Sequence, residues 1–245
     1  MYSDEEAAAL YDLLNPWGPS DDFYLALILD AKSVVDIGCG TGALLHRARQ
    51  AGHAGRLCGV DPDAASLDVA RRYTGIEWEL CSASSMTWDG EFDLATMTGH
   101  AFQALVSDDE LRASLTAIRK ALVSGGHFAF ETRNPEARAW ERWNPANAMD
   151  VVDVSGRPVR ISHQVESVVS DVVTFTETTS EQGGGPLRLD RASLRFLHAD
   201  ALTRILADTG FEIEAPYGDW GRGRLARESP EIVTIARAAT LRRTW

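Results

Sequence analysis

Residues 34–45 read VVDIGCGTGALL, and this stretch decides the fold. An apolar run that holds one carboxylate, Asp36, is followed by glycines at three alternate positions and then by a helix-like pattern. Glycine allows backbone angles and close approaches that a Cβ forbids. In open α/β sheets, ligands bind at the carboxyl ends of the strands. The stretch therefore predicts a buried strand that ends in a loop whose bare backbone cradles a small molecule.

The size and charge of the chain limit the classes of function. It has 245 residues, of which 44% are hydrophobic, so one domain, or one domain with an insertion, can bury a sizeable core. The formal net charge is −12, from 36 acidic against 24 basic residues. Proteins that read nucleic acid usually present a basic surface. The charge therefore argues against DNA or RNA as a partner.

The cysteines and the N-terminal residues bear on the cellular compartment. Cys39, Cys58 and Cys81 are odd in number and lack C-x-x-C spacing, which predicts a reduced protein with neither a disulfide framework nor a metal site. The first ten residues, MYSDEEAAAL, lack the basic and apolar regions of a signal peptide. No apolar run reaches the ~18 residues needed to span a bilayer. We expect a cytoplasmic protein without membrane contact.

Apolar runs alternate with amphipathic stretches from Ser33 onward. Repeated strand-helix units are typical of parallel strands joined by right-handed crossovers, in a sheet that is buried on both faces. Before these units, residues 4–14 are expected to form a helix, and a second helix is expected over 21–30 with Ser20 as its cap. The expected strands are 33–37, 56–60, 76–80, 92–97 and 126–131, and the expected helices are 42–51, 63–72 and 108–122.

The pattern changes after Pro135. A helix is expected over 135–143, followed by Val- and Thr-rich segments whose turn signals favour antiparallel hairpins, at about 150–155, 158–169, 171–180 and 187–197. The earlier pattern then resumes, with a helix over 199–209 and strands over 211–215 and 231–237. The expected domains are an N-terminal helical cap (1–32), an α/β domain formed by 33–148 and 198–245, and an inserted antiparallel β lid (149–197).

The glycine order separates two classes of cofactor. The dinucleotide fingerprint is G-x-G-x-x-G, whereas residues 36–42 read D-x-G-x-G-x-G, which resembles the first motif of class I S-adenosylmethionine-dependent methyltransferases. The resemblance implies an α/β fold with a doubly wound, seven-stranded, Rossmann-like sheet whose last strand is antiparallel, and S-adenosylmethionine as the cofactor. Further landmarks of the family follow in order at 59–62 (GVDP), 81–86 (CSASSM), 92–100 (FDLATMTGH) and 122–126 (LVSGG), so the resemblance covers most of the chain.

The resemblance also implies roles in the glycine loop. Asp36 would anchor the loop, and the backbone at Gly38, Cys39 and Gly40 would pass near the methionine end of the cofactor. The Cys39 side chain is interpreted as a small packed residue rather than a nucleophile, because no histidine partner stands near it in the sequence. Tyr11 is similar to an N-terminal aromatic that closes over the cofactor in small-molecule members, and its alternative is the apolar face of a helix.

The remaining cofactor residues are implied in the same way. Asp61 would hold the ribose hydroxyls, with Pro62 beside the adenine. Ser82 stands where many relatives carry an acid. Ala83 and Ser84 would then contact the adenine through backbone or hydroxyl groups. Thr98 would lie close to the sulfonium.

The candidate catalytic residue is His100. It follows the fourth strand, near the expected position of the transferable methyl, and a histidine titrates in the range suited to proton transfer. Its alternatives are to cap the next helix or to contact the cofactor carboxylate. At the same edge, Arg133 could clamp an acidic substrate or pair with Glu131 or another acid. Tyr217 and Trp220 lie in a loop that could cover the acceptor or form ordinary surface.

The acceptor class is narrowed by motifs of the family that this chain lacks. Methyltransferases of DNA amino groups and of glutamine amides usually carry D/N-P-P-Y after the fourth strand, where residues 97–100 here read MTGH. The β-rich insertion resembles lids of small-molecule N- and O-methyltransferases, where it would cover the pocket or form a subunit contact in a homodimer. The expected function is methyl transfer to nitrogen or oxygen of a small molecule, such as a specialised metabolite. Two alternatives remain: an inactive cofactor-binding protein that works through partner contacts, and a nicotinamide dehydrogenase.

Overall fold

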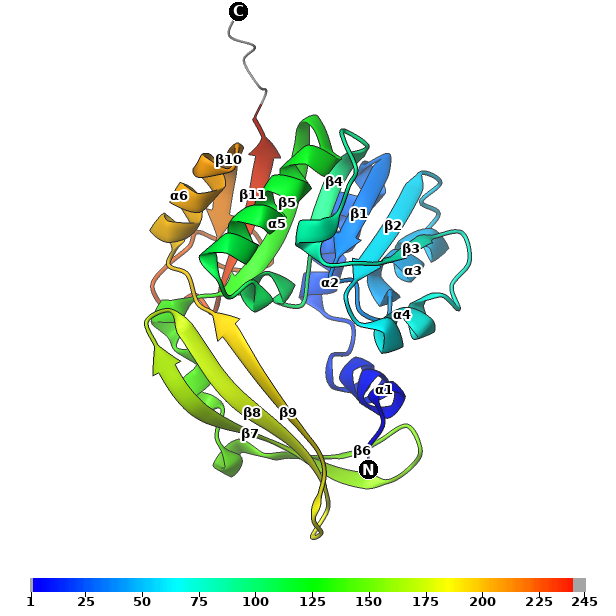
Figure 1. Cartoon of the computed structure of the whole chain (residues 1–245), viewed down its shortest axis with the longest axis vertical. Helices are drawn as coiled ribbons and strands as arrows, with labels where there is room; N and C mark the ends of the chain where they lie inside the picture. Colours follow the sequence, from blue (N-terminus) through cyan, green and yellow to red (C-terminus); the bar gives the residue numbers. More distant parts are fainter. Residues whose placement is uncertain (1, 240–245) are drawn as a thin grey trace, which may run out of the picture.

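The fold is a seven-stranded sheet with a smaller second sheet below it, as seen in a computed structural model that describes residues 2–239 (Figure 1). The order of the strands in the large sheet is β10-β11-β5-β4-β1-β2-β3. Strand β11 runs antiparallel to both of its neighbours, and β1 to β5 pair in parallel. The predicted doubly wound sheet with an antiparallel last strand is confirmed. The strands are β1 (Ser33–Ile37), β2 (Arg56–Asp61), β3 (Glu77–Leu80), β4 (Phe92–Met97), β5 (Leu122–Arg133), β10 (Phe211–Tyr217) and β11 (Glu231–Ala238).

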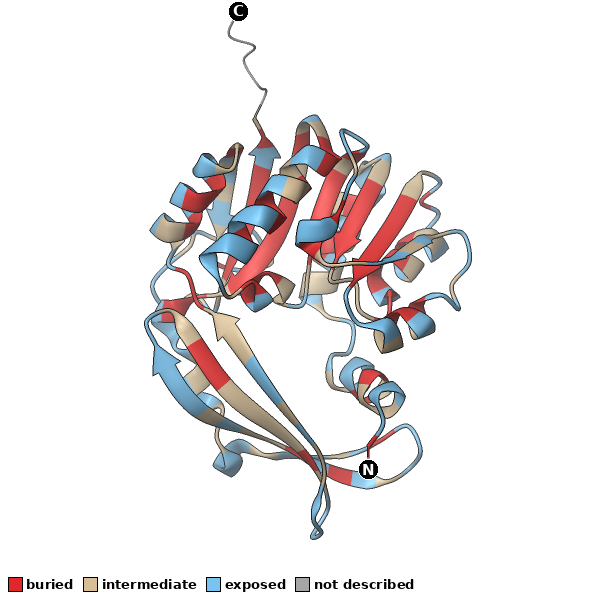
Figure 2. Ribbon diagram, viewed as in Figure 1, coloured by how far each residue is buried: buried red, intermediate tan, exposed pale blue. Residues whose placement is uncertain are grey.

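Helices cover both faces of this sheet, which explains why its central strands are mainly apolar. On one face, α2 (Pro19–Asp30) and α3 (Ala43–Gln50) pack on β1, β2 and β4. On the other, α5 (Asp108–Ala121) and α6 (Ala199–Asp208) pack on β4, β5 and β11. Figure 2 shows the buried residues concentrated in the strands between these helices. The remaining helices are α1 (Asp4–Leu14) and α4 (Ala64–Ala70), and none of the described helices is both long and apolar enough to cross a membrane.

The second helix begins earlier than the sequence suggested. It starts at Pro19, with Gly18 at its N-cap, and so Ser20 lies inside the helix rather than capping it. Proline suits the first turn of a helix, because its fixed φ is helical and its missing N–H would have no partner there. The Asp21 carboxylate accepts a hydrogen bond from the Gly18 N–H at 2.8 Å, which supplies the cap.

The inserted residues form a four-stranded antiparallel sheet in the order β6-β7-β8-β9. Its strands are β6 (Met149–Val152), β7 (Pro158–Val169), β8 (Val172–Glu181) and β9 (Pro186–Arg195), and we call this sheet the lid. The lid lies beyond the carboxyl ends of the large sheet, and α1 lies between the two (Figure 1). The last part of the expected α/β domain, residues 240–245, lies outside the described residues.

The helix predicted over 135–143 is wrong. Two short 3-10 turns, Pro135–Ala137 and Ala139–Arg142, stand in its place. Arg138 separates them with a φ of 46°, in the left-handed region, which ends a right-handed helix. The chain changes direction here as it passes from the large sheet to the lid.

Candidate active site

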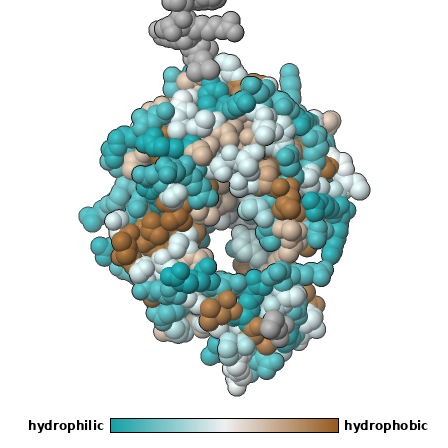
Figure 3. Space-filling model, viewed as in Figure 1, coloured by the Kyte–Doolittle hydropathy of each residue, from teal (hydrophilic) through white to brown (hydrophobic). Residues whose placement is uncertain are grey.

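A cavity of about 690 Å³ lies at the carboxyl edge of the large sheet, next to the glycine loop. Its walls come from α1, α2, the glycine loop, the ends of β2, β4 and β5, and the loop at Trp220. Figure 3 shows the molecule hollowed between the large sheet and the lid. A second cavity of similar volume, about 700 Å³, lies between the lid and residues 135–140 and holds none of the residues predicted for the site. The first cavity is therefore the candidate active site.

The glycine loop turns between β1 and α3 with its backbone exposed to this cavity. Gly38 has a φ of 72°, and a Cβ there would lie 2.8 Å from the Cβ of Ala101. Gly40 has a φ of 53°, and a Cβ there would meet no atom within 4 Å, so its bare face opens onto the cavity. The N–H groups of Gly38 and Cys39 donate to the Val60 carbonyl at 2.8 and 3.0 Å, which holds the loop against β2. The loop is a fixed cradle, and packing against Ala101 requires glycine at position 38.

Asp61, at the end of β2, faces the cradle. Its carboxylate accepts hydrogen bonds from the N–H groups of Gly40 and Asp63, both at 2.8 Å. The residue is 8% exposed, and burial raises the pKa of its carboxyl group. Each oxygen of a carboxylate can accept more than one hydrogen bond. Asp61 therefore braces the glycine loop and retains acceptor capacity toward the cavity.

Asp36 lies inside the sheet beneath the loop. Its side chain is 1% exposed and accepts a hydrogen bond from the Thr96 hydroxyl at 2.7 Å. Burial raises the pKa of Asp36 to about 7, and the nearby carboxylates of Asp61 and Glu131 act in the same direction. A carboxyl group in this environment ionises more readily once a cation approaches it.

The cavity brings together ten of the fourteen residues that the sequence predicts for the site. The four others lie outside its lining. Pro62 and Ser84 are exposed, Ala83 is buried in the core, and Tyr217 packs against the core under the Arg222 guanidinium. The adenine contacts of Pro62, Ala83 and Ser84 therefore remain predictions. The ten residues that line the cavity are Tyr11, Asp36, Gly38, Cys39, Gly40, Asp61, Thr98, His100, Arg133 and Trp220.

Helix α1 forms one wall of the cavity. The hydroxyl of Thr41, in the glycine loop, donates to the Asp12 carboxylate at 2.8 Å and ties the helix to the loop. Tyr11 is 53% exposed, with its ring open to the cavity, while its hydroxyl lies where a Cβ on Gly99 would be only 3.0 Å away. Burial of the hydroxyl, together with the charge of Glu131, raises the pKa of Tyr11. Tyr11 thus lines the cavity and is not part of the hydrophobic core.

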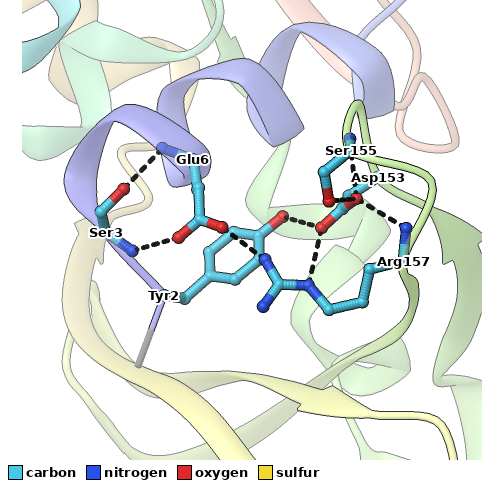
Figure 4. A network of polar contacts seen from close by, with 6 residues as sticks. All are labelled: Tyr2, Ser3, Glu6, Asp153, Ser155 and Arg157. Carbon is cyan, nitrogen blue, oxygen red and sulfur yellow. Dashed lines mark hydrogen bonds and ion pairs between the residues drawn. The ribbon is translucent and has the colours of Figure 1, made fainter.

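The first turn of α1 is fastened to the lid by a polar network (Figure 4). The Arg157 guanidinium donates to Asp153 at 3.1 Å and to Glu6. The Tyr2 hydroxyl also donates to Asp153, at 3.2 Å, and Ser3 and Glu6 cap the helix through reciprocal hydrogen bonds. Hydrogen bonds from the Ser155 side chain, and then from Arg157, lower the pKa of Asp153. The lid, α1 and the glycine loop are therefore linked in series.

His100 has a strained backbone and a carboxylate partner. Its φ of 63° lies in the left-handed region, and its N–H donates to Glu131 at 2.8 Å. Its ring Nε2 lies 3.0 Å from Glu231, at the start of β11. His100 occupies the N-cap position of the 3-10 turn Ala101–Ala104, but its side chain makes no capping hydrogen bond. Its ring is therefore held by Glu231, and the helix-capping alternative accounts only for its backbone.

Glu131 also lines the cavity, although the sequence suggested it only as an alternative partner for Arg133. It is 2% exposed and accepts hydrogen bonds from the Tyr24 hydroxyl and the His100 N–H. Burial raises the pKa of its carboxyl group. The position of Glu131 could have been predicted from strand alternation. Residues two apart on a strand face the same side of the sheet, and Arg133 was already expected at this edge. Tyr24 carried no such signal, since its position follows from how α2 packs.

Arg133 is largely buried and has a neutral partner. Its Nη1 donates to the Gln103 side-chain carbonyl at 3.1 Å, and its guanidinium lies 5.4 Å from the centre of the Trp143 ring. Burial lowers its pKa, while Glu231 and Glu131 act in the opposite direction. Within residues 2–239 it forms no ion pair, so the expected alternative of a pair with Glu131 is not realised.

The residues present fit a cofactor with a positive charge that must lie against backbone. Five carboxylates line the cavity, against the single arginine Arg133. Such a wall attracts cations, and S-adenosylmethionine carries both a sulfonium and an ammonium. The bare face of Gly40 leaves room for the methionine part, which a side chain there would fill. The carboxylates are Asp12, Asp21, Asp36, Asp61 and Glu131.

Comparisons with known proteins point to the same class of fold. A family model described as a methyltransferase domain matches residues 34–126. The chain is 29% identical over 140 residues to a cypemycin N-terminal methyltransferase from a Streptomyces species, covering 54% of this chain and 56% of that protein. The matches to curated relatives cover between 47% and 67% of those proteins, about half of their length.

Solved structures resemble the chain over nearly all of its length. A S-adenosylmethionine-dependent methyltransferase from Clostridium acetobutylicum superimposes with a TM-score of 0.76 at 17% identity, covering 96% of this chain and 98% of that one. The amino pentose methyltransferase CalS10 from Micromonospora echinaspora, solved with S-adenosylmethionine bound, gives a TM-score of 0.71 at 21% identity, covering 98% of both chains. Residues 34–126 thus match a methyltransferase domain, and the chain has the Rossmann-like fold of S-adenosylmethionine-dependent methyltransferases.

Proposed function

We propose that the protein transfers a methyl group from S-adenosylmethionine to nitrogen or oxygen of a small molecule. The observation that carries this proposal is the single cavity that joins the glycine cradle, Asp61 and His100, whose ring is held by Glu231. The names of two relatives specify the N-terminus of cypemycin and an amino pentose as substrates, which is consistent with an acceptor of this kind. We propose that Tyr11, Asp36, Gly38, Cys39, Gly40, Asp61, Pro62, Ala83, Ser84 and Thr98 bind the cofactor.

The protein contributes position and proton transfer. When bound, the cofactor supplies an electrophilic methyl whose sulfur leaves with its bonding electrons as a neutral thioether. Alignment of the acceptor supplies much of the rate in a displacement of this kind. His100 would take the proton of the acceptor on Nδ1, because its Nε2 faces Glu231 and therefore carries the other proton. Glu231 would stabilise the imidazolium that results.

The lid and Trp220 would enclose the acceptor. Trp220 lines the cavity and packs against Phe23 and Tyr24, with ring centroids 5.8 Å apart in each case. Tyr217 would support this loop from the core rather than touch the acceptor. We propose that the lid (149–197) covers the pocket, and its alternative role is a contact between two copies of the chain. We also propose that the protein is cytoplasmic. Light scattering on the purified protein would detect a homodimer.

Calorimetry and a methylation assay test the function. We expect S-adenosylmethionine and S-adenosylhomocysteine to bind to the wild type, and NAD not to bind. Radioactive methyl transfer to a panel of primary amines and hydroxyl compounds would then identify the acceptor atom. Binding without transfer to any acceptor would favour an inactive cofactor-binding protein, and tight binding of NAD alone would favour a dehydrogenase.

His100→Ala tests the proton acceptor once an acceptor is known. We expect kcat to fall by roughly 10²–10⁴-fold for an acceptor that must lose a proton, with the affinity for S-adenosylhomocysteine unchanged. Glu231→Gln should lower kcat less and shift the pH profile, since it alters the partner of the ring rather than the ring. Unchanged turnover in His100→Ala would remove His100 from the mechanism.

A further inference from the structure

We propose that the methyl acceptor carries an oxyanion, a carboxylate or a phosphate, and that Arg133 binds this group inside the cavity. The inference rests on the proposed function and narrows its acceptor to a substrate class. It starts from the environment of the Arg133 side chain, which lines the same cavity as the glycine cradle.

A buried cation without an ion-pair partner is unusual. Removal of a guanidinium from water is costly unless an anion or a full set of hydrogen bonds replaces the water. Within the described part of the chain, the only hydrogen-bond acceptor of Arg133 is the neutral carboxamide of Gln103. Gln103 is completely buried, and its amide nitrogen donates to the Arg195 carbonyl at 2.9 Å, which orients its oxygen toward Arg133. The fold therefore fixes Arg133 in place without a direct ion pair.

The two nearest carboxylates already have other partners. Glu131 accepts from the Tyr24 hydroxyl and the His100 N–H, and Glu231 lies against the His100 ring. The Nε and Nη2 atoms of Arg133 donate no hydrogen bond to residues 2–239, although each arginine offers five donors. These unused donors form one side of the planar fork that binds carboxylates and phosphates in a bidentate manner. The Trp143 ring beside the guanidinium restricts its rotation.

The charges of the cavity give the acceptor one orientation. Among the described residues that line it, Arg133 is the only arginine, and the carboxylates are Asp12, Asp21, Asp36, Asp61 and Glu131. An oxyanion is therefore attracted at one point and repelled elsewhere. Arg133 lies two residues beyond Glu131 on β5, and Glu131 holds the backbone of His100. An acceptor anchored by its oxyanion at Arg133 therefore extends toward Thr98, Gly99 and His100, where the methyl is expected.

Oxyanion binding can be measured without knowledge of the natural acceptor. We would titrate benzoate and methyl phosphate by calorimetry into protein saturated with S-adenosylhomocysteine, using wild type, Arg133→Gln and Arg133→Lys. Arg204→Gln is the matched control, because Arg204 pairs with Asp200 on the exposed side of α6. We expect at least one of the two probes to bind to the wild type and to Arg204→Gln equally. Its affinity should fall by about tenfold or more in Arg133→Gln and by less in Arg133→Lys, which keeps the charge but loses the fork. Comparison of the two probes distinguishes a carboxylate from a phosphate.

Titration of S-adenosylhomocysteine into the same four proteins supplies the second readout. We expect its Kd to agree within about twofold among them, because Arg133 would act on the acceptor. A tenfold loss confined to Arg133→Gln would assign the arginine to the carboxylate of the cofactor and overturn the inference. Equal oxyanion binding by wild type and Arg133→Gln, or no binding by the wild type, would overturn it while the cofactor titration still supported the proposed function. If S-adenosylhomocysteine did not bind to the wild type, the proposed function itself would fall, and the inference with it. Arg133→Lys provides the comparison if Arg133→Gln does not fold.

Discussion

At the scale of single residues, the site depends on atoms that are absent as much as on side chains that are present. Gly38, Gly40 and Gly42 all have positive φ, but a Cβ would have a different consequence at each. At Gly42 it would lie 2.3 Å from the Trp78 ring, and at Gly38 it would lie 2.8 Å from Ala101. At Gly40 it would meet no atom. Packing requires glycine at positions 38 and 42, whereas Gly40 leaves space for a ligand.

Gly40→Ala separates this role from backbone strain. Its matched control is Gly90→Ala, because Gly90 has a φ of 68°, against 53° for Gly40, and a Cβ at either position meets no atom within 4 Å. Both substitutions should cost about 1 kcal/mol of stability, from the left-handed backbone. Only Gly40→Ala should weaken S-adenosylhomocysteine binding, by roughly tenfold, which corresponds to about 1.4 kcal/mol. Urea unfolding and calorimetry measure the two effects, and equal cofactor affinities in the two variants would contradict the cradle.

At the scale of elements, α1 connects the lid to the glycine loop. One end of the helix contacts the lid through Arg157, Asp153 and Glu6, and the other contacts Thr41 through Asp12 (Figure 4). Arg188 of β9 adds a second link from the lid, to Asp4 at 2.6 Å. Leu10 of α1 also packs against Val159 and Ile161 of the lid, so polar contacts and a small apolar cluster together hold the helix in place. Cofactor binding should therefore be sensitive to contacts that lie outside the cavity.

Arg157→Gln should loosen α1 without altering the cavity wall. We expect amide hydrogens of residues 4–14 to exchange about threefold faster or more, because local opening tracks the loss of such contacts. The affinity for S-adenosylhomocysteine should fall as well, since Tyr11 and Asp12 lie on this helix. Arg160→Gln is the control, because Arg160 pairs with Asp150 within the lid alone, at 2.7 Å. Equal exchange of residues 4–14 in the two variants would show that Arg157 does not hold the helix.

At the scale of the whole molecule, a carboxyl group inside the sheet couples folding to pH. Burial raises the pKa of Asp36 from its ordinary value to about 7. The folded state then binds a proton that the unfolded chain releases near pH 4. Stability falls with rising pH wherever the folded state binds more protons. Asp36 therefore lowers the stability of the protein progressively between about pH 4 and pH 7, and by a constant amount above that range.

Asp36→Asn should remove this contribution while its side-chain oxygen still accepts the hydrogen bond from Thr96. Relative to the wild type, the variant should gain stability as the pH rises from about 4 to 7, by at most about 1.4 kcal/mol per pH unit. Urea unfolding of both proteins at several pH values, without cofactor, gives the difference directly. A difference that stays constant from pH 4 to 8 would mean that the folded-state pKa of Asp36 is ordinary.

The sequence by itself determined the large sheet, because its signals are local. Apolar runs, the glycine loop and the strand-turn pattern of the insertion each specify an element within about a dozen residues. The expected strands all appear: 33–37, 92–97 and 158–169 have the expected bounds, and the others have shifted ends. The longest shift is at β5, which begins at Leu122 rather than residue 126. The prediction of a helix over 135–143 was wrong because it rested on local composition. The left-handed turn at Arg138 depends instead on the path of the chain from the large sheet to the lid.

Only the tertiary structure decided which charged groups meet. Glu231 reaches His100 across 131 residues, Tyr24 reaches Glu131 across 107, and Arg157 reaches Glu6 across 151. No local pattern encodes such pairs, because they depend on which strands and helices become neighbours. The same holds for Arg133: the sequence placed it at the carboxyl edge, but only the packed structure showed a buried cation left with a neutral partner. Burial, which changes the energy of a charge, is a property of the whole fold.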